Sequence, residues 1–246
     1  MMLRTCITGE LSILMLIEAL ELAGISCIMA NTDGATFYLK RTKLEEFYNI
    51  CNLWCKKTNY LLEYFEFKSL WFLGINSYLG LKTDGEVKRK GDFLIDTELH
   101  KKKKYSIIPR ALSEYFISGK DPEEYINESN NIYDFCSRSS AGDTYKHMVG
   151  DKQLGKLLRY FVAKKGDHIM KIVREGVDTN AKDTNLEPAD YPKRVVNNLP
   201  KKIHEEELAK VDRSWYITKV REIIFKIERG RDPKPTELNK NQLTLW

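Results

Sequence analysis

One aspartate stands where a carboxylate could be held rigidly enough for metal chemistry. Two short β-prone runs, 26–30 and 35–39, flank the tetrapeptide 31–34, whose residue types favour a tight turn. We therefore expect a β-hairpin with Asp33 at or beside its tip. A carboxylate fixed there can bind Mg²⁺, which prefers oxygen ligands and is commonly coordinated by protein carboxylates and substrate phosphates together. An Asp-Gly pair in a hairpin is also ordinary turn chemistry, so the spacing alone leaves both interpretations open.

A second candidate is a strand with basic residues followed by a glycine. Residues 86–90 are expected to form this strand, and alternate residues of a strand share a face. Lys88 and Lys90 should therefore point the same way, with Arg89 opposite, and Gly91 would permit close approach of a phosphate backbone. Phosphate contacts supply salt-sensitive affinity for nucleic acid that does not depend on base sequence. The competing interpretation is a solvated edge strand protected by its lysines.

The cysteines and histidines form no recognisable metal-ligand pattern. Five cysteines are scattered along the chain, an odd number that fits a reducing compartment better than a disulfide framework. Cys51 and Cys55 share a predicted helix but lack a second ligand pair. No nucleophile elbow surrounds Cys136 and Ser139, and no motif places a histidine beside them. We assign these residues no catalytic or metal-binding role.

Composition indicates a folded chain. The 246 residues, of which 42% are hydrophobic, suffice for one core or for two smaller ones. A formal charge of +5 says little about partners, but the basic residues cluster, which permits a one-sided basic surface. The apolar run 11–22 is interrupted by acids and is too short to span a bilayer, and no signal peptide is evident. A cytoplasmic location is therefore expected.

The elements that position the candidate residues predict an α+β protein without regular βαβ alternation. The spacing of apolar residues predicts a buried helix over 9–23 that ends at Gly24. A second helix is expected from Thr42, its predicted N-cap, to about residue 59. Before the strand 86–90, three further strands are expected, at 61–67, 70–75 and 77–81.

The second half of the chain is predicted to be mainly helical, with one β-hairpin. The expected segments are helices over 109–117 and 122–136, a hairpin over 159–173 turning at 165–167, a polar loop over 175–200 with a short strand at 194–196, and a helix over 212–229. The stretch 92–105, with its run of four lysines, suggests a boundary. It divides the chain into residues 1–104, residues 105–230 and a loosely packed tail, 231–246.

The first part of this order resembles the palm of family B DNA polymerases, especially those of phages and viruses. In that family a hairpin with an Asp-Thr-Asp tip carries a metal-binding second aspartate, and Asp33 matches that position. Asn31 stands at the first position, which departs from the usual pattern. The resemblance implies that Asp33 binds the catalytic metals, with Asn31 and Thr32 supporting the site around it.

A second part of the chain is similar to the palm hairpin that follows the primer–template duplex in the same family. There a basic motif contacts the primer strand. The resemblance implies DNA contacts from the residues that match this hairpin: Asn76, Tyr78, Lys88, Arg89, Lys90 and Gly91. Looser similarities, at 107–116, 159–166, Lys171 and 211–217, imply a thumb from residue 105 onward.

The resemblance implies a partial antiparallel palm followed by a mainly helical thumb with a β-hairpin. It also implies template-directed nucleotidyl transfer by a DNA-directed DNA polymerase, with two Mg²⁺ ions, primer–template DNA and deoxynucleoside triphosphates. The first palm aspartate, the fingers and the exonuclease have no match in this sequence and are expected on an N-terminal polymerase piece. This chain alone is therefore expected to be inactive, as a piece of a split or truncated enzyme.

Two alternatives stay open. One is a non-catalytic DNA-binding palm–thumb remnant, which Asn31 favours, and the other is an unrelated α+β protein whose Asp-Gly turn is structural. If a partner polypeptide completes the palm, the first helix is expected to expose apolar residues such as Ile7 and Leu14. For a viral protein, the expected location is the host cytoplasm.

Overall fold

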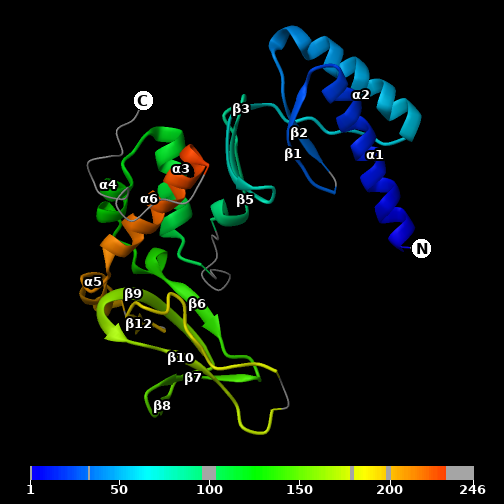
Figure 1. Ribbon diagram of the computed structural model, residues 1–246. Coiled ribbons are helices and arrows are strands. Elements are labelled where there is room, and N and C mark those ends of the chain that lie inside the picture. The colour runs from blue at the N-terminus through cyan, green and yellow to red at the C-terminus, as the bar shows by residue number, and fades with distance from the viewer. Residues whose placement is uncertain (1, 33, 96–103, 178–179, 198–200, 231–246) are drawn as a thin grey trace. The chain divides into compact units, whose positions relative to one another are not determined.

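The computed structural model describes residues 2–32, 34–95, 104–177, 180–197 and 201–230 (Figure 1). It is a mixed α and β structure with antiparallel sheets, as predicted. Two compact units make up the chain: the N-terminal unit, residues 1–76 and 80–87, and the C-terminal unit, residues 77–79 and 88–246. No helix among the described residues is long and apolar enough to cross a membrane.

The N-terminal unit begins with two helices and a hairpin. Its first elements are α1 (Met2–Leu22), β1 (Ser26–Ala30), β2 (Ala35–Tyr38), the 3₁₀ turn η1 (Arg41–Lys43) and α2 (Leu44–Thr58). A small core contains Leu16 and Leu20 of α1 and Cys51 and Trp54 of α2, together with Ile25. The Trp54 indole donates from Nε1 to the carbonyl of Ser12 at 2.7 Å, which ties α2 to α1.

Helix α1 is less buried than its apolar spacing predicts. Leu11 and Leu14 are 59% and 58% exposed, so the prediction of a buried helix is wrong. The reason is that this small core covers one face of a helix of 21 residues. The expectation that Ile7 and Leu14 are exposed is confirmed. Gly24, with a φ of 72°, follows the helix as predicted.

Helix α2 starts one residue later than predicted. Thr42 lies inside η1 and does not cap the helix, because Lys43 occupies the N-cap position without a side-chain cap. At the other end, Asn59 adopts the left-handed conformation with a φ of 59°. Its N–H donates to the carbonyl of Cys55 at 2.9 Å, so the predicted end of the helix is confirmed.

A three-stranded sheet follows, with the strand order β3-β4-β5. Its strands are β3 (Phe67–Gly74), β4 (Ser77–Lys82) and β5 (Val87–Lys90). The prediction of a strand over 61–67 is wrong, because residues 59–66 are irregular. The other three predicted strands of this region are confirmed to within a few residues. Gly85, with a φ of 89°, forms the predicted turn between β4 and β5 and donates to the carbonyl of Lys82 at 3.1 Å.

The helices of the C-terminal unit pack with one another through α3, α4 and α6 (Figure 1). Its helical elements are η2 (Gly91–Phe93), α3 (Ile107–Ser118), α4 (Pro122–Glu128), η3 (Ile132–Phe135), α5 (Lys201–Leu208) and α6 (Arg213–Arg229). Helix α4 is shorter than the predicted 122–136, because Ser129 is extended and its carbonyl accepts from Arg213 Nη2 at 2.9 Å. Helix α6 is confirmed, and the Asp212 side chain accepts from the N–H of Trp215 at its start.

The strands of the C-terminal unit form two sheets, ordered β12-β9-β6 and β11-β10-β7-β8. They are β6 (Ser137–Ser140), β7 (Tyr145–Val149), β8 (Lys152–Gln153), β9 (Leu157–Asp167), β10 (Met170–Val173), β11 (Thr184–Asn185) and β12 (Lys193–Val195). The predicted hairpin over 159–173 is wrong, because β9 and β10 belong to different sheets. This unit therefore contains more β-structure than a mainly helical thumb.

Strand β9 is the centre of the first of these sheets. It pairs with β6 on one edge and with β12 on the other. Tyr160 and Phe161 are 5% and 0% exposed although they point to opposite faces, so both faces of this strand are covered and both residues belong to the core. The predicted strand at 194–196 is confirmed as β12, and the predicted tail, 231–246, lies outside the described residues.

Candidate nucleic-acid interface

The β1–β2 hairpin closes around residues 31–34, as predicted. Ala30 pairs with Ala35, and the N–H of Asn31 donates to the carbonyl of Gly34 at 2.9 Å. Asp33, the predicted metal ligand, lies outside the described residues. Asn31 Oδ1 would lie 3.7 Å from a Cβ on Gly34, so this amide oxygen bends over the turn. The turn therefore presents one neutral oxygen donor of the kind that Mg²⁺ accepts.

A shallow groove of about 350 Å³ lies between α1 and the hairpin tip. Its lining is mostly apolar and comprises Glu10, Ile13, Leu14, Ile17, Ala30, Asn31 and Thr32. Thr32, at the tip, is itself exposed. Apolar side chains thus border the tip on the side of α1.

The turn between β4 and β5 is held by local contacts. Asp84 Oδ1 accepts from the N–H of Glu86 at 2.8 Å, and Lys82 forms an ion pair with Glu86. The Lys82 ammonium also lies 4.9 Å from the ring centroid of Phe65. Its hydrogen bond with Glu86 raises the pKa of Lys82. The turn thereby fixes the start of β5, the strand that carries the predicted phosphate contacts.

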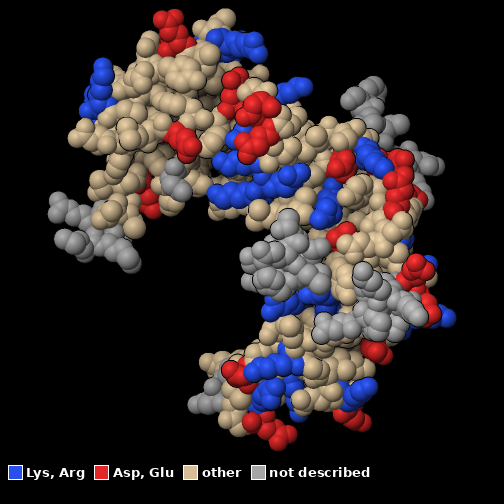
Figure 2. Space-filling model, turned by 180° about the vertical axis from the view of Figure 1, so that it is seen from behind, with Lys and Arg blue, Asp and Glu red and all other residues tan. Residues whose placement is uncertain are grey.

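The three basic residues of β5 divide between two faces. Arg89 Nε donates to Ser113 Oγ of helix α3 at 3.2 Å, so this side chain points toward α3 within the C-terminal unit, to which both residues belong. Lys88 and Lys90 are partly buried and, by strand periodicity, point to the opposite face. Figure 2 shows Lys and Arg side chains gathered in a patch over the β3–β5 sheet. The sequence-based expectation about their directions is consistent with this contact.

A corner stabilised by hydrogen bonds follows β5. Gly91 has a φ of 63°, a conformation that favours glycine, and begins η2. Ser77 Oγ donates to Asp92 Oδ2 at 3.1 Å and accepts from the N–H of Asp92 at 3.0 Å. The same carboxylate binds Lys104 at 2.5 Å, which lowers the pKa of Asp92. The start of β4 and the end of β5 are thereby joined.

The other two predicted DNA contacts differ in their exposure. Asn76, in the connection before β4, is exposed, whereas Tyr78 is 9% exposed and belongs to the core. Tyr78, Lys88, Lys90 and Gly91 all lie in the β4–β5 hairpin or directly after it. The structure thus brings most of the predicted DNA contacts into one supersecondary element.

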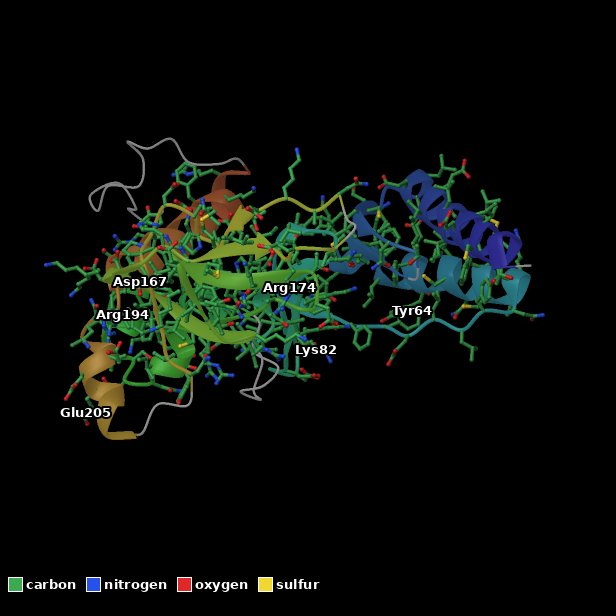
Figure 3. All side chains as sticks on the ribbon, turned by 90° about the horizontal axis from the view of Figure 1, so that it is seen from below. Tyr64, Lys82, Asp167, Arg174, Arg194 and Glu205 are labelled. Atoms are coloured by element: carbon green, nitrogen blue, oxygen red, sulfur yellow. The ribbon has the colours of Figure 1, made fainter. Side chains whose placement is uncertain are left out.

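A second basic cluster lies in the C-terminal unit and consists of Lys171, which was singled out from the sequence, and Arg174, which was not. Arg174 Nε donates to the carbonyl of Tyr145 at 2.8 Å, and Figure 3 labels this side chain. Lys171 Nζ donates to the carbonyl of Ser140 at 3.0 Å and lies 5.8 Å from the Tyr145 ring centroid. The cluster depends on the pairing of β7 with β10, so no local signal in the sequence predicts it.

A buried carboxylate anchors helix α5 to strand β12. Glu207 is 6% exposed and accepts from Arg194 Nε at 2.6 Å and Arg194 Nη2 at 2.8 Å. Lys210 adds a third hydrogen bond at 2.6 Å. These contacts, the Arg194 bonds first, lower the pKa of Glu207. The hydrogen bonds with Glu207 raise the pKa of Arg194, and the charge of Asp167, which Figure 3 shows beside Arg194, adds to this rise. This ion cluster serves structure, because its cations are already paired with Glu207.

One buried histidine connects the two sheets of the C-terminal unit. His147 is fully buried, and its Nδ1 lies 3.0 Å from the carbonyl of Gly155. Because a carbonyl only accepts, Nδ1 carries the proton, and Nε2 accepts from Ser139 Oγ at 3.0 Å. Both side chains of this pair are buried.

No group of three His, Cys, Asp or Glu residues in the described part of the chain is placed to hold a metal ion. Among the predicted site residues, Asn31 and residues 88–91 belong to the described part of the structure. The metal-binding role of Asp33 remains a prediction. Neither a family model nor a curated protein sequence matches this chain.

Proposed function

We propose that this chain binds primer–template DNA as the C-terminal palm and thumb portion of a family B DNA polymerase. The observation that supports it most directly is the β4–β5 hairpin. It presents Lys88 and Lys90 on the face opposite the Arg89–Ser113 hydrogen bond and ends at Gly91 with a φ of 63°. Two cations spaced two residues apart on a strand, roughly 7 Å, can follow successive backbone phosphates, and a glycine lets the backbone come close.

In the proposed enzyme Asp33 is a metal-binding residue. The flanking residues Asn31 and Gly34 close the turn with a backbone hydrogen bond of 2.9 Å, and an aspartate carried by such a turn would add its carboxylate to the amide oxygen of Asn31. These oxygen donors suit Mg²⁺ but do not complete a two-metal site. A second carboxylate is proposed to come from a polypeptide that carries the first palm aspartate and the fingers. Bound Mg²⁺ would neutralise charge on the triphosphate during nucleotidyl transfer.

DNA binding is tested with a fluorescent primer–template hairpin at a series of salt concentrations. We expect the wild-type chain to bind the duplex, with a logarithm of the binding constant that falls linearly with the logarithm of the salt concentration. In Lys88→Ala and in Lys90→Ala the magnitude of this slope should decrease by about 0.9, because each variant loses one phosphate contact. Lys57→Ala on helix α2 removes the same charge from an exposed site and is the matched control. The proposal would be wrong if the chain did not bind the duplex at low salt, or if the salt dependence of binding had the same slope in all variants.

Catalysis is tested by primer extension after mixing the chain with its proposed N-terminal partner. Asp33→Asn should lower the extension rate by orders of magnitude, because it removes a metal-bound charge, and should leave duplex affinity unchanged. Asp84→Asn is the control, since an amide keeps the Oδ1 acceptor that binds the N–H of Glu86. Unchanged extension by Asp33→Asn would contradict a metal-binding role.

The second candidate function is non-catalytic DNA binding by the same surface. Asn31 favours it, because the usual family tip carries an aspartate at that position. This candidate predicts the same salt slope without any extension, even with the N-terminal partner present. The two experiments together therefore separate the enzyme from the DNA-binding remnant.

A further inference from the structure

Arg89 is attached to the buried side of helix α3. Its acceptor, Ser113, is 3% exposed, and the Ser113 hydroxyl donates to the carbonyl of Pro109 at 2.8 Å. The serine proton is therefore committed to the helix backbone, and the oxygen lone pairs are available to Arg89 Nε at 3.2 Å. In this hydrogen bond Arg89 of strand β5 is therefore the donor and Ser113 of helix α3 is the acceptor.

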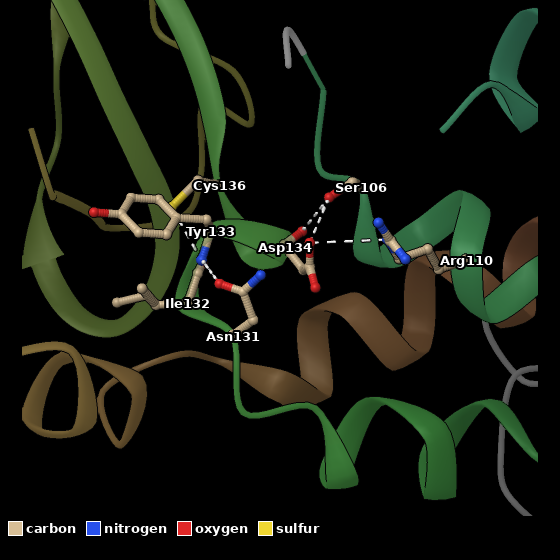
Figure 4. Close-up of polar contacts among 7 residues, drawn as sticks. All are labelled: Ser106, Arg110, Asn131, Ile132, Tyr133, Asp134 and Cys136. Carbon is tan, nitrogen blue, oxygen red and sulfur yellow. Dashed lines mark hydrogen bonds and ion pairs between the residues drawn. The ribbon is translucent and has the colours of Figure 1, made fainter. Parts of the chain in front are cut away.

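Helix α3 is itself a firm attachment point. At its N-terminus, Ser106 Oγ donates to Asp134 Oδ1 at 3.1 Å, and Arg110 Nε lies 3.8 Å from the same oxygen (Figure 4). Ile107 and Leu112 are 1% and 0% exposed, so the helix packs into the core. The hydrogen bond from Arg89 therefore fixes the position of strand β5 relative to helix α3.

A second link holds the end of β5 close to the same helix. Phe93, two residues after Gly91, is fully buried, and η2 packs against α3. The Ser77–Asp92–Lys104 contacts hold the same corner on its exposed side. Strand β5 is therefore fixed both at Arg89 and just beyond its end.

We infer that Arg89 is a positioning residue, which sets Lys88 and Lys90 for phosphate contact by binding Ser113 and does not itself bind a phosphate. This inference rests on the proposed DNA-binding function. A side chain that bonds a buried serine on one face of a strand is directed away from the phosphates on the other face. The basic triplet thus contains two phosphate ligands and one anchor, although all three residues carry the same charge.

The test compares duplex affinity and salt slope in the full-length chain carrying single substitutions. Ser113→Ala changes no charge and should weaken binding roughly threefold to tenfold with an unchanged slope, since it removes one hydrogen bond of the anchor. Arg89→Lys keeps the charge but lacks Nε, and it should show the same loss. Lys90→Met, in contrast, should reduce the slope by about 0.9. Arg89→Met should weaken binding without that reduction.

Two results would overturn the inference. One is wild-type affinity in both Ser113→Ala and Arg89→Lys, and the other is a slope in Arg89→Met that falls as far as in Lys90→Met. In the double variant Ser113→Ala with Arg89→Met, the losses should not add, because both changes break the same bond. If the wild-type chain does not bind the duplex, the proposed DNA-binding function is wrong. If the wild-type chain binds the duplex but Arg89 contacts a phosphate, only the inference about Arg89 is wrong.

Discussion

The hydroxyl of Tyr216 accepts a hydrogen bond from the backbone N–H of Val162, at 2.9 Å, in the buried centre of the C-terminal unit. The same hydroxyl donates to the carbonyl of Phe135 at 2.7 Å. Strand β6 stops pairing with β9 at Tyr160, so Val162 lies beyond its reach. A side chain from helix α6 therefore replaces the strand that has ended.

Removing this hydroxyl should destabilise the C-terminal unit. Tyr216→Phe leaves a buried N–H and a buried carbonyl without their partner, which we expect to cost about 2 kcal/mol of unfolding free energy. The measurement is urea unfolding followed by circular dichroism. Tyr191→Phe, at a residue 41% exposed, is the control and should change little. Equal unfolding midpoints for the two variants would contradict the prediction.

Substitution of Gly166 by a larger residue should destabilise the C-terminal unit, because there is no room for a Cβ atom. A Cβ at this position would lie 2.4 Å from the carbonyl oxygen of Lys193 and 2.9 Å from its carbon. Both are backbone atoms of the neighbouring strand, so Gly166→Ala must push β9 and β12 apart. We expect a loss of roughly 1–3 kcal/mol in unfolding free energy. Gly155→Ala, whose Cβ would meet only the Leu157 carbonyl at 3.6 Å, should be tolerated.

Stability should fall in mild acid because of His147. Burial lowers the pKa of His147, the hydrogen bond to Gly155 opposes this shift, and Lys171, opposite on β10, lowers the pKa further. The unfolded chain takes up a proton near the ordinary pKa of about 6.5, while the folded chain does so only at lower pH. The contribution of His147 is thus present above that value and is lost as the pH falls below it.

This pH dependence can be assigned to one residue by substitution. Unfolding free energy measured from pH 7.5 down to pH 5 should decline less steeply in His147→Gln than in the wild-type chain, although the variant starts from lower stability. His168→Gln, at an exposed histidine, should keep the wild-type slope. An identical pH slope in His147→Gln and wild type would rule out His147 as the source.

Local signals predicted the first part of the fold well. The hairpin around residues 31–34, the turn at Gly85 and the helix end at Asn59 depend on dihedral preferences of a few neighbouring residues, and all three are found. Thr42 shows the limit even of local rules, since a 3₁₀ turn occupies the place of its expected cap.

Non-local pairing accounts for most of the errors. Gly166 suggested a turn, but it is needed where β9 passes close to the backbone of Lys193. Strands β6 and β7 have polar or short sequences and form because β9 and β10 lie beside them. Helix α5 lacks a long apolar stripe and is held by Glu207 to Arg194. The role that we infer for Arg89 likewise depends on Ser113, which is 24 residues away in the sequence.

The position of β9 between β6 and β12 also has a consequence for synthesis on the ribosome. Its edges are completed by residues on both sides in the sequence, at 137–140 and 193–195, and by a bridge from Ala163 to Val211. During translation β9 emerges when only its earlier partner exists, and closing such distant contacts is slow. We therefore expect the C-terminal unit to acquire its native core late, after α6 with Tyr216 has been released, while the N-terminal unit can fold earlier.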